Sequence, residues 1–384
     1  MGDIFEIARG GSPRPIDAYI TDADDGINWI SIADASDSSK YIERTKRRIR
    51  PEGATRSRAV VPGDLLLTNS MSFGRPYIMR TTGCIHDGWL VLAKKREGID
   101  QDFFYRLLGS ETVYAAFARL AAGATVKNLN IELVKGVSVP VPSLPEQRRI
   151  AAILDQADAL RAKRREALAQ LDSLTQSIVI EMFGNPVSNS MRWPMRAFGQ
   201  ICETRLGKML DQKQQTGEHS RPYLRNSNVQ WHRLDLSDVF QMDFDQSARG
   251  VFRLQPGDLL ICEGGEPGRA AIWTGEIAEC YYQKALHRAR PNSGAAVAEY
   301  LAWLLWFLSK LGGLGDHVTA ATIAHLTGEK LKAMSVMLPP LALQQTFATR
   351  IQAVESLKTT HRAALAELDA LFASLQHRAF SGTL

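Results

Sequence analysis

The stretch Leu144-Pro-Glu-Gln-Arg-Arg-Ile-Ala-Ala-Ile-Leu154, which continues to Phe183, predicts one long helix. Proline is tolerated in the first turn of a helix, where its missing N–H would have no partner, and Gly184-Asn-Pro186 provides a stop. From Ile150 to Ile178 apolar residues recur at alternating steps of three and four, which is typical of a coiled-coil seam. A helix of this length needs a partner along that seam.

The chain itself supplies the partner, because the same pattern returns 197 residues later. Leu171-Asp-Ser-Leu174 corresponds to Leu368-Asp-Ala-Leu371, and the register is shared over about 35 positions. Two unrelated surface helices would not share such a register, so we predict an internal duplication. The expected seam residues are Ile150, Ile153, Leu160, Leu171, Leu174 and Ile178 of the first helix and Phe347, Val354, Leu357, Leu368, Leu371 and Leu375 of the second.

The segments before each helix repeat as well. Pro62-Gly-Asp-Leu-Leu66 returns 194 residues later as Pro256-Gly-Asp-Leu-Leu260, and Thr125 returns 197 residues later as Thr322. The predicted organisation is a domain over residues 1–143, a central helix over 144–185, a second domain over 186–340 and a last helix over 341–384. Loops differ between the copies, as two binding sites of different specificity on one scaffold would require.

Within the two domains, short β-rich runs separated by Pro and Gly predict strands, and apolar residues at helical spacing predict helices. Strands are expected at 29–32, 64–68, 76–79, 89–92, 136–142, 258–262 and 334–337, and helices at 102–121 and 297–309. The apolar window 300–308 is short, which indicates a buried helix rather than a membrane span.

Composition restricts the class of protein. The chain has 384 residues, is 45% hydrophobic and 23% charged, and has a formal net charge of +5, which favours an anionic partner. Its four cysteines form no C-x-x-C pair, so neither a zinc site nor a disulfide framework is indicated, and reduced thiols fit a cytoplasmic protein. No basic-then-apolar signal segment follows Met1.

Catalytic motifs are missing from the sequence. We find no phosphate-binding G-x-x-x-x-G-K-[ST], no H-E-x-x-H and no G-x-S-x-G. Leu338-Pro-Pro-Leu341 lacks the Asn and the aromatic residue that a DNA adenine methyltransferase would need. We therefore expect a non-catalytic protein with no catalytic residue, no metal and no cofactor of its own.

Basic clusters indicate nucleic acid. Five cations lie in Arg44–Arg50, a run that could hold a phosphate backbone or be a solvated face. In the second copy, Arg225–Asn228 and Tyr281–Lys284 carry side chains that read base edges, because Arg pairs with guanine and Asn or Gln with adenine. The predicted DNA contacts are Arg44, Lys46, Arg47, Arg48, Asn69, Arg75, Arg225, Asn226, Asn228, Arg269, Gln283 and Lys284. Arg161–Arg165 could face DNA or water, and water is favoured.

Val139-Pro-Val-Pro-Ser-Leu-Pro-Glu-Gln-Arg-Arg-Ile-Ala-Ala-Ile-Leu154, its weaker copy from Val336, and Gly123–Asn130 make the chain resemble specificity (S) subunits of type I restriction–modification systems. This resemblance implies an α+β fold: two pseudo-repeated α/β target recognition domains, separated and joined by two long antiparallel coiled-coil helices. Each domain would read half of a split double-stranded DNA target. Two adenine methyltransferase (M) subunits would dock, and restriction–translocase (R) subunits would complete the nuclease. S-adenosylmethionine, Mg and ATP would be bound only by those partners.

Two departures from the family pattern stand out. The second helix begins Leu341-Ala-Leu-Gln-Gln, without the Pro and the charges of the first, and Gly2-Asp-Ile-Phe has no counterpart of Trp193-Pro-Met-Arg, which leaves a shortened amino terminus open. Two other classes also stay open: a fused methyltransferase or nuclease, and a tandem-repeat coiled-coil adaptor without sequence-specific DNA reading. If the family reading holds, a 40-residue helix about 60 Å long would set the gap between the half-sites.

Overall fold

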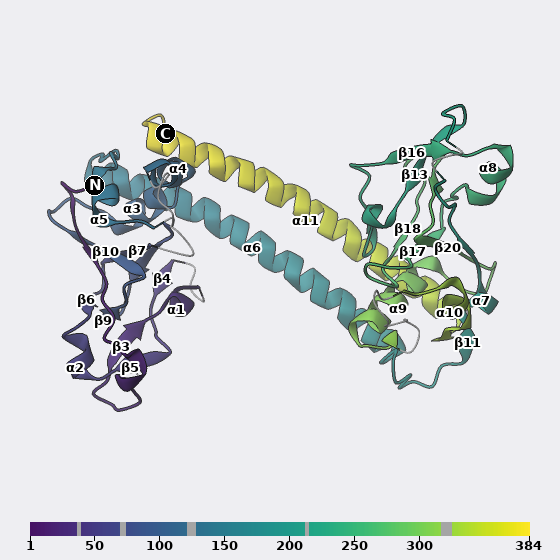
Figure 1. Cartoon of the computed structure of the whole chain (residues 1–384), viewed down its shortest axis with the longest axis horizontal. Coiled ribbons are helices and arrows are strands. Elements are labelled where there is room, and N and C mark those ends of the chain that lie inside the picture. Colours follow the sequence, from purple (N-terminus) through teal and green to yellow (C-terminus); the bar gives the residue numbers. More distant parts are fainter. Residues whose placement is uncertain (37–39, 70–73, 121–127, 212–214, 316–324) are drawn as a thin grey trace. The chain divides into compact units, whose positions relative to one another are not determined.

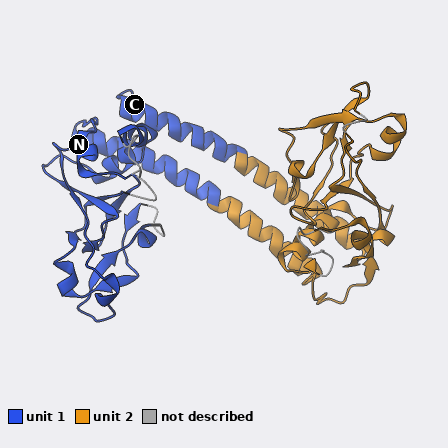
Figure 2. Cartoon of the chain, viewed as in Figure 1, with its two compact units in different colours: residues 1–165, 363–384 blue, residues 166–362 orange. Residues whose placement is uncertain are grey.

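The computed structural model describes residues 1–36, 40–69, 74–120, 128–211, 215–315 and 325–384 (Figure 1). The chain divides into two compact units, one of residues 1–165 with 363–384 and one of residues 166–362 (Figure 2). Each unit holds an α/β domain and the adjoining part of both long helices. The four predicted domains are consecutive segments of the chain, whereas each compact unit combines one domain with parts of both helices. The predicted domain boundaries are therefore not tested by this division and stay a prediction.

Unit 1 contains two sheets. The first has the strand order β1-β10-β7-β8-β4, and the second has β2-β5-β3-β9-β6. The strands are β1 (Phe5–Arg9), β2 (Ile20–Thr21), β3 (Ile27–Ile30), β4 (Tyr41–Ile42), β5 (Arg47–Ile49), β6 (Arg58–Val60), β7 (Leu65–Thr68), β8 (Pro76–Met79), β9 (Gly83–Ile85) and β10 (Trp89–Lys94). The helices are α1 (Ile32–Ser36), α2 (Pro51–Ala54), α3 (Gln101–Leu108), α4 (Glu111–Leu120) and α5 (Ile131–Gly136). Phe103, Phe104 and Phe117 of the helices fill the core beneath the first sheet.

Unit 2 repeats this plan with smaller sheets. Its main sheet has the order β12-β20-β17-β18, and a second sheet has β16-β13-β19. The strands are β11 (Met195–Ala197), β12 (Cys202–Leu206), β13 (Ser220–Leu224), β14 (Val229–Gln230), β15 (Arg233–Leu234), β16 (Phe240–Asp243), β17 (Leu259–Cys262), β18 (Ala270–Ile272), β19 (Tyr281–Tyr282), β20 (Leu286–Pro291) and β21 (Ser335–Met337). The helices are α7 (Phe198–Ile201), α8 (Gln246–Phe252), α9 (Ala298–Lys310) and α10 (Gly328–Ala333). Helix α9 is buried, as predicted for its apolar window.

The duplication extends to strand register. Phe5 pairs with Lys94 in unit 1, and Cys202 pairs with Pro291 in unit 2, so both members are displaced by 197 residues. Strands β1 and β12 are each followed by a glycine, Gly10 or Gly207, whose N–H donates to a carbonyl of the opposite strand. A Cβ at either glycine would overlap backbone atoms of a neighbouring turn, so only glycine fits there. The predicted α+β fold with two pseudo-repeated domains is confirmed.

Two predicted elements were wrong. The helix expected at 102–121 is broken into α3 and α4 at Gly109-Ser110, and Ala121 lies outside the described residues. The strand expected at 136–142 is not formed, whereas its counterpart in unit 2 is β21. Strand β21 pairs with β11, Met195–Ala197, while in unit 1 the Val137 carbonyl accepts from the Met1 amino group instead. A strand needs such a partner, which local sequence does not reveal.

Helices α6 (Leu144–Phe183) and α11 (Leu341–Ser381) are continuous over 40 and 41 residues. Within each unit their adjoining parts run antiparallel. In unit 1, Arg161 pairs with Asp369 and Arg149 reaches the Leu384 carbonyl near the other end. In unit 2, Lys358 bonds to Thr175 at 3.2 Å, while Arg350 lies 3.9 Å from Glu181. The predicted antiparallel pairing is therefore present in both units.

The seam between the helices differs from the predicted one at alternate positions. Ile150, Ile178, Phe347 and Val354 are buried as expected, and Ile153, Leu171, Leu368 and Leu375 are partly buried. The leucines Leu160, Leu174, Leu357 and Leu371 are instead 48%, 45%, 51% and 49% exposed. The residue after each of them takes the inward place: Arg161, Thr175, Lys358 and Phe372. Three of these four inward residues are polar. A prediction that assigns apolar residues to the seam therefore chooses the leucine before each of them instead.

Candidate nucleic-acid interface

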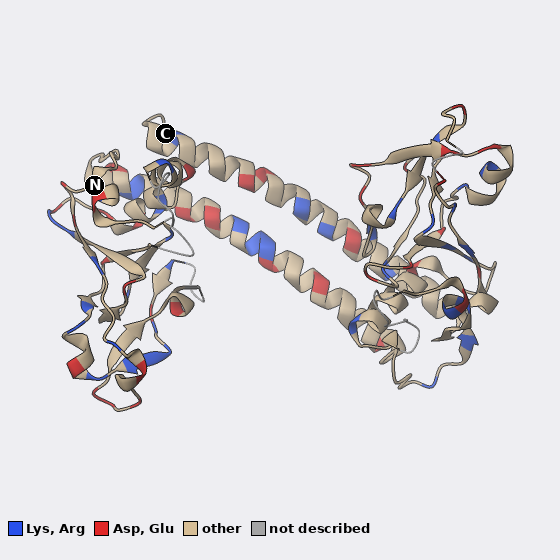
Figure 3. Ribbon diagram, viewed as in Figure 1, with Lys and Arg blue, Asp and Glu red and all other residues tan. Residues whose placement is uncertain are grey.

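The basic run Arg44–Arg50 does not form a single patch. Arg47 lies opposite Trp29 and Arg48 lies opposite Asn28 in the β3–β5 ladder. Successive residues of a strand point to opposite faces, so these two arginines serve different faces of the sheet. All four predicted cations of the run, Arg44, Lys46, Arg47 and Arg48, are exposed, and basic residues colour the ribbon around β5 (Figure 3).

Arg47 borders an open cavity of about 570 Å³ that also involves Arg14, Trp29 and His86. The Gly88 N–H donates to His86 Nδ1 at 2.9 Å, which places the imidazole proton on Nε2. Burial lowers the pKa of His86, although Asp87 opposes this, so the ring is neutral at pH 7. Arg14 is held loosely by Asp87 at 3.4 Å and is 80% exposed. The cavity thus presents hydrogen-bond donors beside an aromatic wall.

Sequence reasoning missed Arg14 and His86, because both are isolated in the chain. The only available signal was the repeat itself: His86 lies 197 residues before Gln283, which was a predicted contact. Tertiary structure brings them together with Arg47, because β3 pairs with β5 on one side and with β9 on the other.

In unit 2 the corresponding strands present different side chains. Tyr223 of β13 lies opposite Phe240 of β16 and beside Tyr281 of β19. Phe240 is 46% exposed and rests on the Arg225 guanidinium, whose centre is 3.4 Å from the ring centroid. Gln283 follows β19, is partly exposed, and joins Lys208 in an isolated bridge. The surface here is therefore aromatic and amide-bearing rather than cationic.

Five predicted contacts are occupied in structural hydrogen bonds. Asn69 and Asn228 are each 2% exposed, and their amides donate to the carbonyls of Asp87 and of Asp235 and Asp238. The Asn226 amide donates to the Gly264 carbonyl, and Arg269 donates to the Asn226 carbonyl, both at 2.9 Å.

Arg225 completes this group, since it pairs with Asp238 at 2.7 Å and stacks on Phe240. These five side chains position loops, and their bonds leave them poorly placed to read bases. Signals of local sequence cannot separate an amide that reads a base from one that caps a turn.

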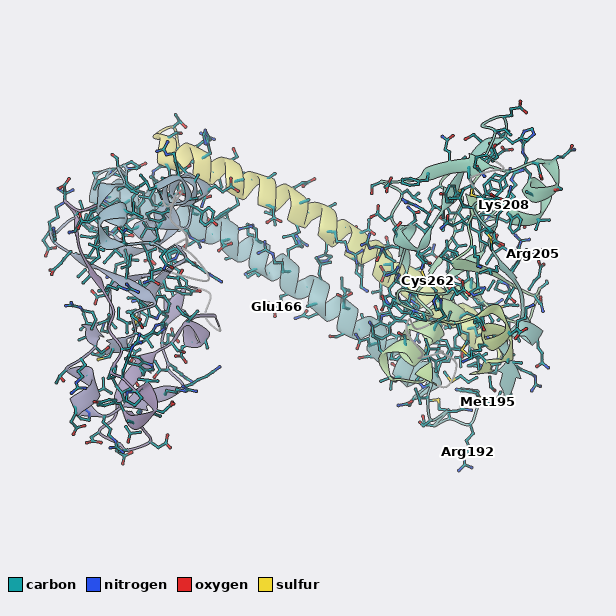
Figure 4. All side chains as sticks on the ribbon, in the orientation of Figure 1. Glu166, Arg192, Met195, Arg205, Lys208 and Cys262 are labelled. Carbon is teal, nitrogen blue, oxygen red and sulfur yellow. The ribbon has the colours of Figure 1, made fainter. Side chains whose placement is uncertain are left out.

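Other predicted contacts remain accessible. Arg75 is exposed beside the Tyr77 ring, and Lys284 is exposed at a cavity of about 650 Å³. Arg205 and Lys332, which sequence reasoning did not select, line the same cavity, and Figure 4 labels Arg205 together with nearby Lys208. Glu263 and Glu329 also line it, so its charge is mixed.

The Arg161–Arg165 segment is largely committed to the helix pair. Arg161 pairs with Asp158 and Asp369 and stacks on Phe372 at 4.3 Å, and only 18% of its side chain is exposed. Arg165 lies 3.1 Å from Asp369. The preference for a water-facing segment was therefore wrong for Arg161, which is an interhelical residue.

Within the described ranges, no group of three or more His, Cys, Asp or Glu side chains could hold a metal ion. In the same part of the chain, no helix has the length and apolar character needed to cross a membrane.

Comparison with known proteins now adds to the geometry. The family model for the type I restriction modification DNA specificity domain matches residues 1–170 and again 191–370. The EcoKI specificity subunit of Escherichia coli K12 is 24% identical over 290 residues, and the match covers 69% of this chain and 61% of that protein. The MjaIX specificity subunit of Methanocaldococcus jannaschii is 24% identical over 246 residues, covering 58% and 55%. The match thus spans about three fifths of each relative.

Solved structures agree on the fold. A chain from a study of assembly and conformational transition in a type I restriction–modification system is 18% identical, has a TM-score of 0.62, and the match covers 100% of this chain and 97% of that one. A type I S subunit from M. genitalium is 15% identical with a TM-score of 0.57, covering 99% and 94%. With two matches of the family model covering most of its length, the chain belongs to the type I restriction–modification DNA specificity family and is an S subunit, a non-catalytic class.

Proposed function

We propose that this chain reads a bipartite double-stranded DNA target and recruits adenine methyltransferase subunits, and restriction subunits where these exist. The observation that carries the proposal is the duplication itself: two domains of one topology carry different exposed side chains on corresponding strands of the second sheet. A common scaffold with different reading surfaces suits a target made of two unlike half-sites.

The exposed leucines of the long helices suit partner recruitment. Leu160 and Leu371 lie beside the Arg161–Asp369 pair in unit 1, while Leu174 and Leu357 lie beside the Lys358–Thr175 pair in unit 2. Each pair is about half exposed, and the positions correspond through the 197-residue repeat. An amphipathic partner helix buries such residues in a groove between two helices. Two equivalent patches fit two copies of one methyltransferase subunit.

The chemistry of methyl transfer and cleavage would then belong to the partners. S-adenosylmethionine, Mg and ATP are expected on those subunits, and the proposed location of the complex is the cytoplasm. Membership of a non-catalytic class disfavours the alternative of a fused methyltransferase. The adaptor alternative differs from the proposal in one respect only, since an adaptor would give no sequence-specific methylation.

Methylome sequencing tests the proposal. The full chain is expressed with its methyltransferase partner in cells that lack other adenine methylation, and the matched control expresses the methyltransferase alone. The expected result is a split adenine-methylated motif that requires this chain. Stable co-purification of the two proteins without any motif would support the adaptor and overturn the proposal.

A further inference from the structure

The second sheet of each unit contains a three-stranded ladder of the same kind. In unit 1 it is built by β5, β3 and β9, and in unit 2 by β16, β13 and β19, with the same antiparallel and parallel pairings. Arg47 and Phe240 occupy the same place in these sheets, because each lies opposite the aromatic residue of the middle strand, Trp29 or Tyr223. Strands β5 and β16 are each followed by a short helix, α2 or α8.

His86 and Gln283 form a second equivalent pair. Each is the residue directly after the parallel strand, β9 or β19. The backbone of each is closely approached by the glycine that follows β1 or β12, Gly10 or Gly207. The duplicated scaffold therefore holds two variable positions, 47/240 and 86/283, in the same setting in both units. In Figure 1, β3 and β5 of unit 1 and β13 and β16 of unit 2 lie away from the long helices of their own unit.

The side chains at these two positions differ in their hydrogen-bonding groups between the units. In unit 1, Arg47 and the Nε2–H of His86 are hydrogen-bond donors on one cavity wall. Guanine offers two acceptors, N7 and O6, on its major-groove edge, and arginine is the side chain that most often bonds to them. In unit 2, Phe240 presents an exposed ring and Gln283 an amide. An amide bonds to both N6 and N7 of adenine, and an apolar ring contacts the thymine methyl group.

We infer that residues 47 and 86 of unit 1 and residues 240 and 283 of unit 2 determine base preference, so that unit 1 reads a half-site containing guanine and unit 2 reads a half-site containing an A·T pair. This inference rests on the proposed function, because it names the bases that the proposed reading surfaces select. Arg225 supports Phe240 from beneath and is itself held by Asp238, which keeps the ring at the surface.

The unit 1 assignment is tested with Arg47→Ala in the full chain, and Arg48→Ala is the matched control. Both substitutions remove one exposed cation from β5, but the two side chains lie on opposite faces. Methylome sequencing with the methyltransferase partner should show that Arg47→Ala relaxes one guanine position of one half-site by about 5- to 150-fold, the range of a bidentate base contact. Arg48 is expected to contact at most the phosphate backbone, so Arg48→Ala should leave the base preference of the methylated motif unchanged.

A chemical probe separates a base contact from a phosphate contact. Replacing that guanine with 7-deazaguanine in a duplex should weaken wild-type binding and leave Arg47→Ala binding nearly unaffected, because only the base contact uses N7. If Arg47 instead holds a phosphate, Arg47→Ala will weaken binding to all sequences equally and will flatten the salt dependence of binding. That result would overturn the assignment.

The unit 2 assignment uses Phe240→Ala, with Gln241→Ala on the opposite face of β16 as its control. Phe240→Ala should relax an A·T position in the half-site that Arg47→Ala leaves intact. Relaxation of a G·C position, or of the same half-site as Arg47→Ala, would overturn the inference. Circular dichroism and co-purification with the methyltransferase verify folding of each variant. A wild-type complex that methylates no split motif would instead refute the proposed function itself.

Discussion

Replacement of Arg106 should loosen unit 1 by a predictable amount. Arg106 lies 2.6 Å from Asp155 and 2.9 Å from Asp158, with 10% of its side chain exposed, and so connects α3 to α6. Breaking a buried ion pair costs about 3–5 kcal/mol when the remaining charge is left alone. Here Asp155 keeps Lys40 at 2.7 Å, Asp158 keeps Arg161 at 2.9 Å, and both carboxylates are more than a third exposed. We therefore expect Arg106→Leu to cost about 2 kcal/mol.

Hydrogen exchange measures this loss locally, which matters because a chain of two units need not unfold in one step. A cost of about 2 kcal/mol should raise exchange rates of amides in residues 101–120 about 30-fold. The control is Arg148→Leu, since Arg148 is 69% exposed and 3.9 Å from Asp100, and it should change rates less than threefold. Equal effects of the two substitutions, or no change for Arg106→Leu, would refute the reasoning.

Four other outcomes are expected. Replacing Leu160 and Leu371 with Glu should reduce capture of the methyltransferase in a pull-down at least tenfold and leave the melting temperature of the chain unchanged. A large fall in the melting temperature would show that these leucines stabilise the chain itself and would contradict a docking role. Burial and the nearby charge of Lys358 lower the pKa of His232 to about 3. The unfolded state therefore takes up a proton below about pH 6.5 and the native state does not, so wild type should lose roughly 2 kcal/mol between pH 7 and pH 5 that His232→Asn does not lose in denaturant titrations. Inserting whole helical turns within residues 155–180 should lengthen the unread gap of the methylated motif; altered half-sites would contradict this. Exchanging residues 186–340 for those of another family member should change one half-site only, as methylome sequencing would reveal.

The same place between domain and helices is filled differently in the two units. Trp303 stands 197 residues after Arg106 and stacks on His232 with ring centroids 3.8 Å apart. At this position unit 1 therefore has an ion pair to α6, whereas Trp303 in unit 2 belongs to the apolar cluster that includes Ile178 and Phe347 of the long helices. In unit 1, burial alone would lower the pKa of Lys40, but hydrogen bonds to Asp102 and Asp155 outweigh it and raise the pKa. That contribution is fully present at neutral pH and is lost only as the pH rises through the raised pKa.

Local pattern was sufficient for the duplication and the long helices. Periodicity is a property of neighbouring residues, so Leu144 and Phe183 could be recognised as the ends of α6 before any packing was known. Burial of α9 also followed from its apolar composition. The family resemblance rested on the motif that begins α6, and the family match confirms it.

Tertiary structure alone decided which residues form the seam between the helices and which form the proposed reading surface. Arg161 and Lys358 face inward because partners on the other helix compensate their charge, and a hydrophobic count cannot see those partners. Asn69 and Asn228 are poorly placed to contact bases because their amides donate to backbone carbonyls. The residues of the proposed reading surface are distant in sequence: Arg47 and His86 in unit 1, and Phe240 and Gln283 in unit 2. Strand pairing places them together, and the pairing of strands depends on contacts that no single stretch of sequence contains.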